Sequence, residues 1–316
     1  MKNKVSKKLC AFAPATIANL SCGFDILGLA LNSVGDRVEV SFAEGTAITI
    51  SEIVNGDNLP KAAEKNCCSV VMQKMRERLG DTRGINIRIY KGFQSGSGLG
   101  SSSASSAAAA FVYNELLDRP FTKEELVPFA MEGERVACGA AHADNVAPAI
   151  LGGIVLVREH NPIDMVQLPV LDSLYGVLMF PNIKIKTADA RQMLPEKIKL
   201  TTATKQWANV GGFVAALYTN NYDLLSKSMQ DLVAEPTRSQ LIPKYQDLKK
   251  VAETNGALAF GISGSGPSVF ALAKSEELAK DIQKAMLDCY ADTGIETMSF
   301  IDKIESKGGA RLSASF

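Results

Sequence analysis

The feature that most constrains this chain is a glycine- and serine-rich loop placed between a strand and a helix. The segment GFQSGSGLGSSSASSAAAAF occupies residues 92–111, directly after the alternating pattern GINIRIYK. That alternation predicts a half-buried strand, and SASSAAAAFVYNELL after the loop predicts a helix. A disordered linker would lack such apolar flanks. We therefore expect a strand, a loop and a helix, which together turn free backbone N–H groups toward an anion.

Several kinds of loop could explain this segment. Gly96, Gly98 and Gly100 permit positive φ and let a ligand approach the backbone closely. A Walker A loop would end in Gly-Lys-Ser/Thr, and this loop has no lysine. The dinucleotide fingerprint G-x-G-x-x-G/A is missed by one serine, and no acidic residue follows about 20 residues later. A serine-rich helix cap that binds no ligand stays open as the structural alternative.

Composition excludes several classes of partner. Basic and acidic residues both number 34, so no overall positive field favours nucleic acid or a membrane surface. No apolar stretch approaches the ~20 residues needed to cross a bilayer, and we interpret the first 20 residues as a strand and loop, not a secretion signal. Six cysteines without a CxxC pattern and only two histidines predict reduced thiols in the cytoplasm and no zinc site.

The remaining patterns predict an α+β protein with two lobes, residues 1–160 and 161–316. Strands are expected at KLCAFAP, DRVEVSF, TAITISEI, GINIRIYK, GGIVLVRE, MVQLP and YGVLMFP, over 257–262 and 268–273, and near 296–302. Helices are expected over 62–79, 187–194, 202–218, 222–233, 243–254 and 276–290. Thr122 and Glu125 form a capping box that predicts a further helix toward Ala137.

The loop sequence GSGLGSSSA resembles the G-L-G-S-S-A phosphate loop of the GHMP kinases, which phosphorylate small molecules. It departs from the usual pattern at two positions: Gln94 stands where proline is common, and Ser103 replaces an alanine. The resemblance implies an α+β fold of two lobes with mixed sheets. ATP would bind between the glycine-rich loop and the C-terminal lobe.

Three further stretches bear on the substrate. APATIANLSCGFDILGLAL, residues 13–31, supplies polar residues on a loop that could line a pocket or simply close a turn. GERVACGAAHADNVAPAILGG, residues 133–153, places Glu, His, Asp and Asn in small apolar surroundings, where polar groups either satisfy one another or face a ligand. TADAR and EPTRSQLIP supply two arginines, which could be solvated or could bind a substrate carboxylate.

Together with SGSGPSVFAL and the terminal GGAR, these stretches resemble the homoserine kinase branch of the GHMP kinases nearly from end to end. That resemblance implies transfer of phosphate from ATP to the side-chain hydroxyl of L-homoserine, a step of threonine biosynthesis. It also implies Mg²⁺ as cofactor, a homodimer and a cytoplasmic enzyme.

The resemblance also implies roles for particular residues. The ATP phosphates would be wrapped by Gly96, Ser97, Gly98, Leu99, Gly100, Ser101, Ser102, Ser103 and Ala104, and Asn66 and Lys91 would lie near the base. Ser101 and Glu134 would be placed for Mg²⁺. The substrate would be met by Asn19, Asp25, His142, Asp144, Asn145, Arg191, Arg238 and Gly264, and Asn19, Asp144 and Thr187 would contribute to catalysis.

A general base is not evident, because no lysine matches the Asp–Lys pair found in some GHMP kinases. If Asp144 binds the substrate ammonium, it is poorly placed to act as the base. We therefore expect the hydroxyl proton to pass toward the γ-phosphate.

Overall fold

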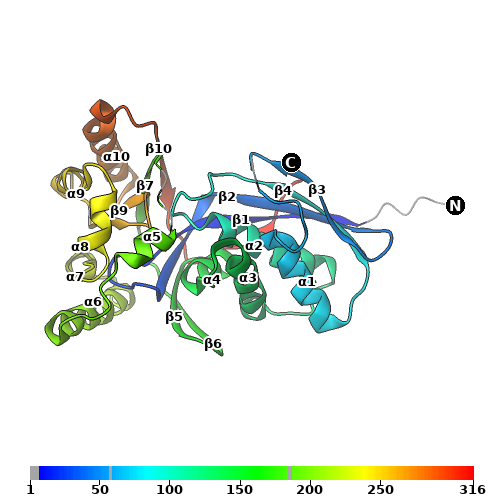
Figure 1. Cartoon of the computed structure of the whole chain (residues 1–316). Helices are drawn as coiled ribbons and strands as arrows, with labels where there is room; N and C mark the ends of the chain where they lie inside the picture. Colours follow the sequence, from blue (N-terminus) through cyan, green and yellow to red (C-terminus); the bar gives the residue numbers. More distant parts are fainter. Residues whose placement is uncertain (1–6, 57–58, 184, 186) are drawn as a thin grey trace.

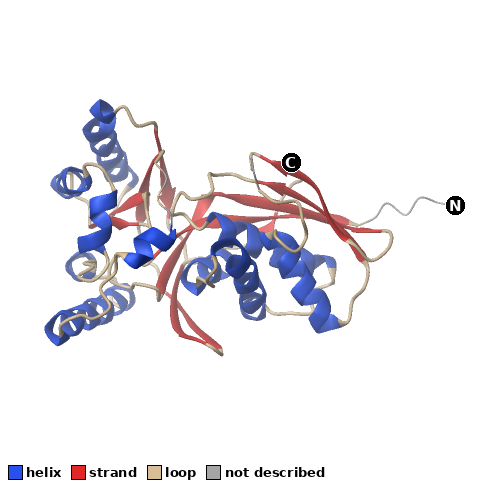
Figure 2. Cartoon of the chain, viewed as in Figure 1, coloured by secondary structure: helices blue, strands red, loops and turns tan. Residues whose placement is uncertain are grey.

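The computed structural model describes residues 7–56, 59–183, 185 and 187–316 of the chain. Its secondary structure falls into two parts: one sheet with four helices against it, and a smaller sheet surrounded by the remaining helices (Figure 1). The mixture of helices and strands in both parts confirms the expected α+β class (Figure 2).

The larger sheet contains seven strands within the described residues, in the order β11-β1-β2-β4-β3, with β5 beside β2 and β6 beside β5. Only β3 and β4 are parallel, so the sheet is mixed. β2 and β3 are consecutive, yet β4 lies between them. The bounds are β1 Lys8–Ala18, β2 Leu27–Ala43, β3 Ile48–Val54, β4 Gly84–Tyr90, β5 Ile154–His160, β6 Ile163–Leu168 and β11 Arg311–Leu312.

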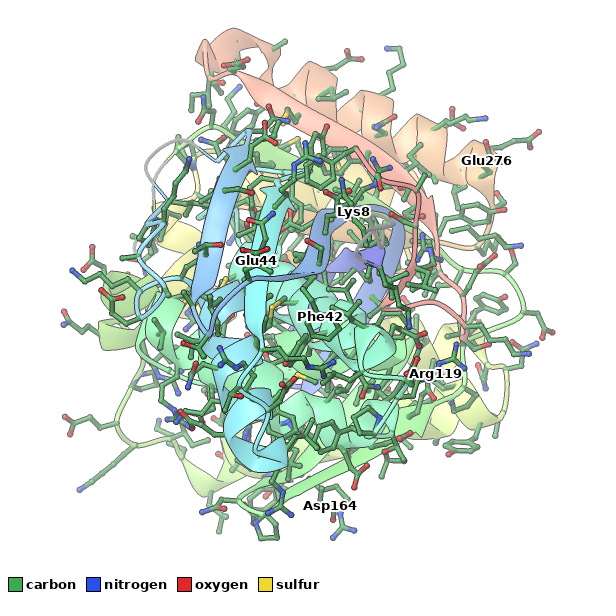
Figure 3. All side chains as sticks on the ribbon, turned by 90° about the vertical axis from the view of Figure 1, so that its right-hand side faces the viewer. Lys8, Phe42, Glu44, Arg119, Asp164 and Glu276 are labelled. Carbon is green, nitrogen blue, oxygen red and sulfur yellow. The ribbon has the colours of Figure 1, made fainter. Side chains whose placement is uncertain are left out.

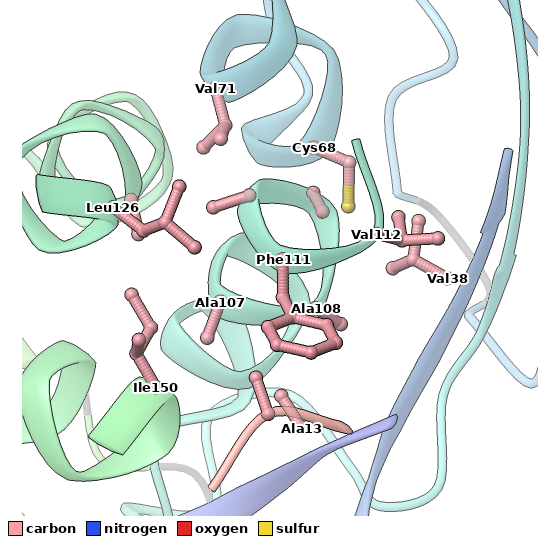
Figure 4. Close-up of a cluster of buried hydrophobic side chains, with 14 of the residues drawn as sticks. Ala13, Val38, Cys68, Val71, Ala107, Ala108, Phe111, Val112, Leu126 and Ile150 are labelled. Carbon is pink, nitrogen blue, oxygen red and sulfur yellow. The ribbon is translucent and has the colours of Figure 1, made fainter. Parts of the chain in front are cut away.

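Four helices pack on one face of this sheet, and the alanine-rich one lies in the middle. Small side chains let that helix contact the sheet and the other helices at once: Ala107, Ala108, Phe111 and Val112 sit in a cluster between strands and neighbouring helices (Figure 4). The bounds are α1 Cys67–Leu79, α2 Ser101–Leu116, α3 Lys123–Cys138 and α4 Ala143–Leu151.

The smaller sheet has the order β10-β7-β9-β8 and is antiparallel throughout. Its strands are β7 Tyr175–Pro181, β8 Ala259–Ile262, β9 Val269–Ala273 and β10 Thr297–Lys303. The helices of this part are α5 Thr187–Gln192, α6 Leu200–Tyr218, α7 Tyr222–Ser228, α8 Glu235–Arg238, α9 Tyr245–Thr254 and α10 Glu276–Tyr290.

Charged side chains are spread over the outside of the molecule, as Lys8, Arg119 and Asp164 illustrate at one end (Figure 3). In the part of the chain that the structure describes, no helix is long and apolar enough to span a membrane.

Several sequence-based boundaries were wrong, each for a local reason. The expected loop over 13–31 shrinks to residues 19–26, because β1 and β2 pair as far as Ala18 and Gly28. The helix expected from residue 62 begins at Cys67, where the Asn66 side chain accepts the Cys68 N–H as an N-cap.

The helix expected over 222–233 ends at Ser228. Beyond it, the Asp231 carboxylate accepts the N–H groups of Val233, Ala234 and Glu235 and so opens the short helix α8. Helix α4 was not expected at all. The Thr122–Glu125 capping box is present as predicted.

Candidate active site

A cleft of about 660 Å³ opens between the two parts of the molecule. The phosphate-loop segment and the helix starts of α1, α2 and α4 line one side, and residues of α5, α8 and the loop after β8 line the other. The expected site residues among its lining are Asn19, Asp25, Asn66, Lys91, Gly96, Gly98, Gly100, Ser101, Ser102, Glu134, His142, Asp144, Asn145, Arg191, Arg238 and Gly264.

The glycine-rich loop presents its backbone to this cleft. Gly96 has a φ of 79°, and a Cβ there would meet open space. Gly100, with φ of 67°, precedes the first turn of α2, and no side chain caps that helix. The first N–H groups of α2 are therefore available to an anion, and the helix dipole favours negative charge at this point.

Four residues expected in the phosphate-binding group have buried side chains. Ser97, Leu99, Ser103 and Ala104 are almost completely buried, with exposures of 1%, 1%, 0% and 0%. Their side chains hold the loop and helix in the core, so only backbone groups of this set could reach a nucleotide. The sequence pattern could not separate these two functions, because serine and small apolar residues suit both.

Gly98 is the point where the loop meets the smaller sheet. The Ser263 hydroxyl donates to the Gly98 carbonyl at 2.8 Å, and the Ser268 N–H donates to the Ser97 carbonyl at 3.2 Å. With φ of 82°, Gly98 leaves room for these contacts, since a Cβ would lie 2.7 Å from the Gly266 carbonyl oxygen. The loop is thus fixed by the β8–β9 turn.

Lys91 lies beneath the loop. Its ammonium is paired with Asp36 and donates to the Ser101 carbonyl at 2.9 Å and to the Ser105 hydroxyl at 2.8 Å. Only 3% of the Lys91 side chain is exposed. A nucleotide contact for Lys91 stays a prediction, and the structure gives its charge a structural partner.

Glu134 and Ser101 carry the oxygen donors expected for Mg²⁺. Glu134 is buried on α3, lines the cleft, and accepts a hydrogen bond of 2.8 Å from the Ser103 hydroxyl at its Oε2. The described residues contain no group of three or more His, Cys, Asp or Glu able to hold a metal. A carboxylate and a hydroxyl nevertheless fit Mg²⁺, which takes few protein ligands and completes its shell with phosphate and water.

The opposite end of the cleft carries charged side chains. Arg191 donates to Asp25 at 2.7 Å. Asn19 donates to the Gly264 carbonyl at 2.9 Å and accepts the Asp25 N–H at 3.0 Å. Arg238 donates to the same Gly264 carbonyl at 3.1 Å. These residues come from sequence positions up to 245 apart and meet at one end of the cleft.

Asp144 is the most perturbed acid of the site. It lies in the first turn of α4 with only 3% exposure. Burial raises its pKa to about 7, and the nearby charges of Asp25 and Glu134 add to this effect. The backbone of α4 approaches β2 closely at this point, because a Cβ on Gly28 would lie 1.7 Å from the Asp144 carbonyl oxygen.

Asn145 and His142 complete the start of α4. The Asn145 amide oxygen accepts a 2.7 Å hydrogen bond from the Thr16 hydroxyl, just below Gly100, so this side chain also links α4 to the phosphate loop. His142 is the N-cap residue of α4. Thr187 begins α5, but its side chain lies outside the described residues.

Sequence reasoning missed the residues that support the loop: Thr16, Asp36, Ser105 and Ser263. Of these, only Asp36 can be inferred once the pairing of the strands is known. In antiparallel β2 and β4, Arg37 is paired with Tyr90, so the next pair along the strands is Asp36 with Lys91. The strand pairing was needed to see it.

Two family models and several known proteins match this chain. Residues 65–153 match the GHMP kinases N terminal domain and residues 213–292 the GHMP kinases C terminal domain. The homoserine kinase of Chlorobium phaeobacteroides (strain BS1) is 45% identical over 90% of this chain and 92% of its own length.

Solved structures agree. The crystal structure of homoserine kinase from Cytophaga hutchinsonii has a TM-score of 0.95 and 44% identity, and the match covers 99% of both chains. The mevalonate kinase of L. major has a TM-score of 0.71 at 18% identity, covering 96% of this chain and 99% of its own, which indicates a shared fold.

Proposed function

This chain belongs to the homoserine kinase branch of the GHMP kinases, and from that premise we propose how its cleft carries out the reaction. The enzyme transfers the γ-phosphoryl group of ATP to the side-chain hydroxyl of L-homoserine, giving ADP and O-phospho-L-homoserine. One observation carries the assignment of roles: a loop with accessible backbone groups and a cluster of charged side chains line two ends of the same cleft.

The ATP phosphates bind along the glycine-rich loop. Open space at Gly96 and the uncapped start of α2 at Ser101 provide backbone donors for phosphate oxygens. Phosphoryl transfer passes through a loose transition state, so catalysis depends mainly on positioning and on stabilising charge. Donors fixed in advance provide this stabilisation without rearrangement.

Glu134 and the Ser101 hydroxyl would hold Mg²⁺. Bound there, the ion would offset the negative charge of the phosphates. Ser103 contributes by orienting the Glu134 carboxylate through its hydrogen bond.

L-Homoserine binds at the charged end. Its carboxylate pairs with the guanidinium groups of Arg191 and Arg238 and with His142, and Asn19 and Asp144 bind the hydroxyl and ammonium end. The ion pair between Arg191 and Asp25 fills this role before the substrate arrives. Substrate binding therefore replaces one carboxylate at Arg191 with another.

The hydroxyl proton passes to the γ-phosphate in this scheme. An Asp144 carboxylate that holds the ammonium is committed to that contact. Its raised pKa of about 7 is nevertheless near the value that suits a general base, so kinetics must separate the two roles.

A coupled ADP-release assay with ATP and Mg²⁺ tests the function. We expect turnover with L-homoserine and little with D-homoserine, L-serine, mevalonate or galactose. Turnover on a different alcohol would overturn the assignment of the charged end, and ATP binding without any turnover would indicate a binding protein that has lost catalysis.

A further inference from the structure

A buried polar cluster lies directly beneath the phosphate loop and takes no part in the reaction described above. It consists of Asp36, Lys91 and Ser105, which come from β2, the end of β4 and the second turn of α2. Lys91 and Ser105 reach the floor of the cleft, whereas the Asp36 side chain is 0% exposed. We propose that Asp36 is a positioning residue that sets the geometry of the phosphate loop.

A single carboxylate holds both ends of the loop. Asp36 Oδ1 accepts the Gly92 N–H at 3.0 Å, where the chain enters the loop. Asp36 Oδ2 accepts the Ser105 hydroxyl at 2.5 Å, where the chain has left the loop and formed α2. Both ends of the segment 93–100 are therefore held relative to one group on β2.

Lys91 extends the same connection. Its ammonium is paired with Asp36 Oδ2 and donates to the Ser101 carbonyl at the start of α2. This hydrogen bond holds the Ser101 carbonyl, which lies next in the chain to the N–H groups expected to bind phosphate. Lys91 links Asp36 to the helix end whose position matters for the nucleotide.

Stability alone is a weak explanation for this cluster. Removing two charges from water is unfavourable, and a buried ion pair often stabilises a fold no better than well-packed apolar residues would. The pair instead fixes the orientation of the groups around it, because each oxygen of Asp36 accepts a hydrogen bond from a defined donor. The backbone at the loop entrance also passes close to β2, because a Cβ on Gly92 would lie 1.9 Å from the Gly35 carbonyl oxygen.

Loss of the Asp36 charge should therefore affect ATP binding and leave homoserine binding unchanged. If Asp36 positions the loop, losing its charge will displace the phosphate-binding N–H groups while the residues around Asp144 and Arg191 keep their places. Misplacement of catalytic groups by about 1 Å can lower rates by about 10²-fold. The expected signature is weaker ATP binding and lower kcat, with the KM for homoserine unchanged. Only the expectation for the KM of homoserine depends on the proposed function; the expectation for ATP binding does not.

The experiment compares substitutions at Asp36 with a substitution at a second buried carboxylate, Asp302. Asp36→Asn removes the charge, and Asp36→Glu keeps the charge but moves it by one methylene. Asp302→Asn is the matched control, because Asp302 is also buried and accepts two backbone N–H groups, from Asn32 and Ser33, neither of which belongs to the loop. Measurements are the ATP dissociation constant by calorimetry with Mg²⁺, the two KM values, kcat and the Tm.

We expect Asp36→Asn to weaken ATP binding about tenfold and to lower kcat/KM for ATP by about 10²-fold. Asp36→Glu should weaken ATP binding about threefold and should fold even if Asp36→Asn does not, since Lys91 keeps a counter-charge. Asp302→Asn should lower the Tm and leave ATP binding within about twofold.

Two results would overturn the proposal: ATP binding unchanged in Asp36→Glu, or Asp302→Asn weakening ATP binding as much as Asp36→Asn at equal loss of Tm. A wild-type enzyme that binds ATP but leaves homoserine unphosphorylated would contradict the proposed function and leave the ATP comparison intact.

Discussion

The two ends of the cleft are built in different ways. The phosphate end is made of backbone groups on a loop that buried side chains hold from below, such as the Lys91–Asp36 pair with exposures of 3% and 0%. The acceptor end is made of polar and charged side chains, some of them buried, such as Asp144 at 3% exposure, and some partly exposed, such as the Arg191–Asp25 pair with exposures of 49% and 33%.

We attribute this difference to the ligand proposed for each end. A phosphate chain presents many equivalent oxygens, and fixed N–H groups suit it without adjustment. An amino-acid substrate presents opposite charges at set positions, which require side chains of both signs. Before the substrate arrives, Arg191 and Asp25 neutralise one another. Substitutions at the phosphate end should therefore alter geometry, and substitutions at the acceptor end should alter charge balance.

The largest effect is expected at Gly98. Gly98→Ala places a Cβ 2.7 Å from the Gly266 carbonyl oxygen and 2.8 Å from the Ser263 carbonyl oxygen, both backbone atoms that cannot turn aside. We expect kcat/KM for ATP to fall by about 10³-fold, the upper range for lost transition-state donors. Gly45→Ala is the control, since Gly45 has a similar φ of 76° and open space at its Cβ. Equal losses in both variants would show that backbone strain alone explains the result.

Asp144→Asn should have the next largest effect, at the acceptor end. Removing one member of a buried charge contact is expected to raise the KM for homoserine by about 10²-fold, with a smaller change in kcat. Steady-state kinetics with each substrate varied in turn would measure this. If kcat collapses and the KM for homoserine stays constant, Asp144 acts as the general base, and the proposed proton route is wrong.

The pH dependence gives a smaller effect at the same residue. Asp144 has a pKa of about 7, so the charged form that binds the ammonium is about tenfold less populated at pH 6 than at pH 8. The KM for homoserine should be higher at pH 6 by that factor, and Asp144→Asn should remove the dependence.

The stability of the ligand-free protein should fall as the pH rises, whereas homoserine binding should improve. The folded pKa of Asp144 lies above its ordinary value of 3.8, which means that the protonated form is favoured in the folded state. This contribution to the free energy of unfolding is present below about pH 4 and is lost as the pH rises through about 7. A rise in stability over this range in wild type relative to Asp144→Asn would contradict the assignment.

The smallest effect is expected at Ser103, the residue that stands where the GHMP pattern has alanine. Ser103→Ala removes the hydrogen bond to Glu134 and leaves the helix packing unchanged. The Mg²⁺ concentration for half-maximal ATP binding should rise about fivefold, the value of one ordinary hydrogen bond. Titration of ATP binding with Mg²⁺ measures this without turnover, and Glu134→Gln should shift it further. No shift with either variant would place the metal elsewhere.

The sequence predicted one end of the cleft better than the other. Glycines at 96, 98 and 100 are required by backbone conformation, so the loop could be located from the chain alone. The functions of Ser97 and Ser103 could not be assigned, because the exposure of a serine in this loop or in the first turn of α2 depends on what packs against it. The Arg191–Asp25 pair and the Asp36–Lys91 pair join segments far apart in the chain, and only the pairing of strands and the packing of α5 bring them together.

The order in which the chain is synthesised gives the last strand a further significance. Strand β11 pairs with β1 through Ala11 and Phe12, and the Ser313 N–H donates to the Cys10 carbonyl. During synthesis, the edge of β1 that pairs with β11 therefore stays unpaired while some 300 later residues are translated. An unpaired apolar strand edge readily joins other strands, so a chain stalled or cut before β11 should be prone to aggregation even though it already contains the residues of the cleft.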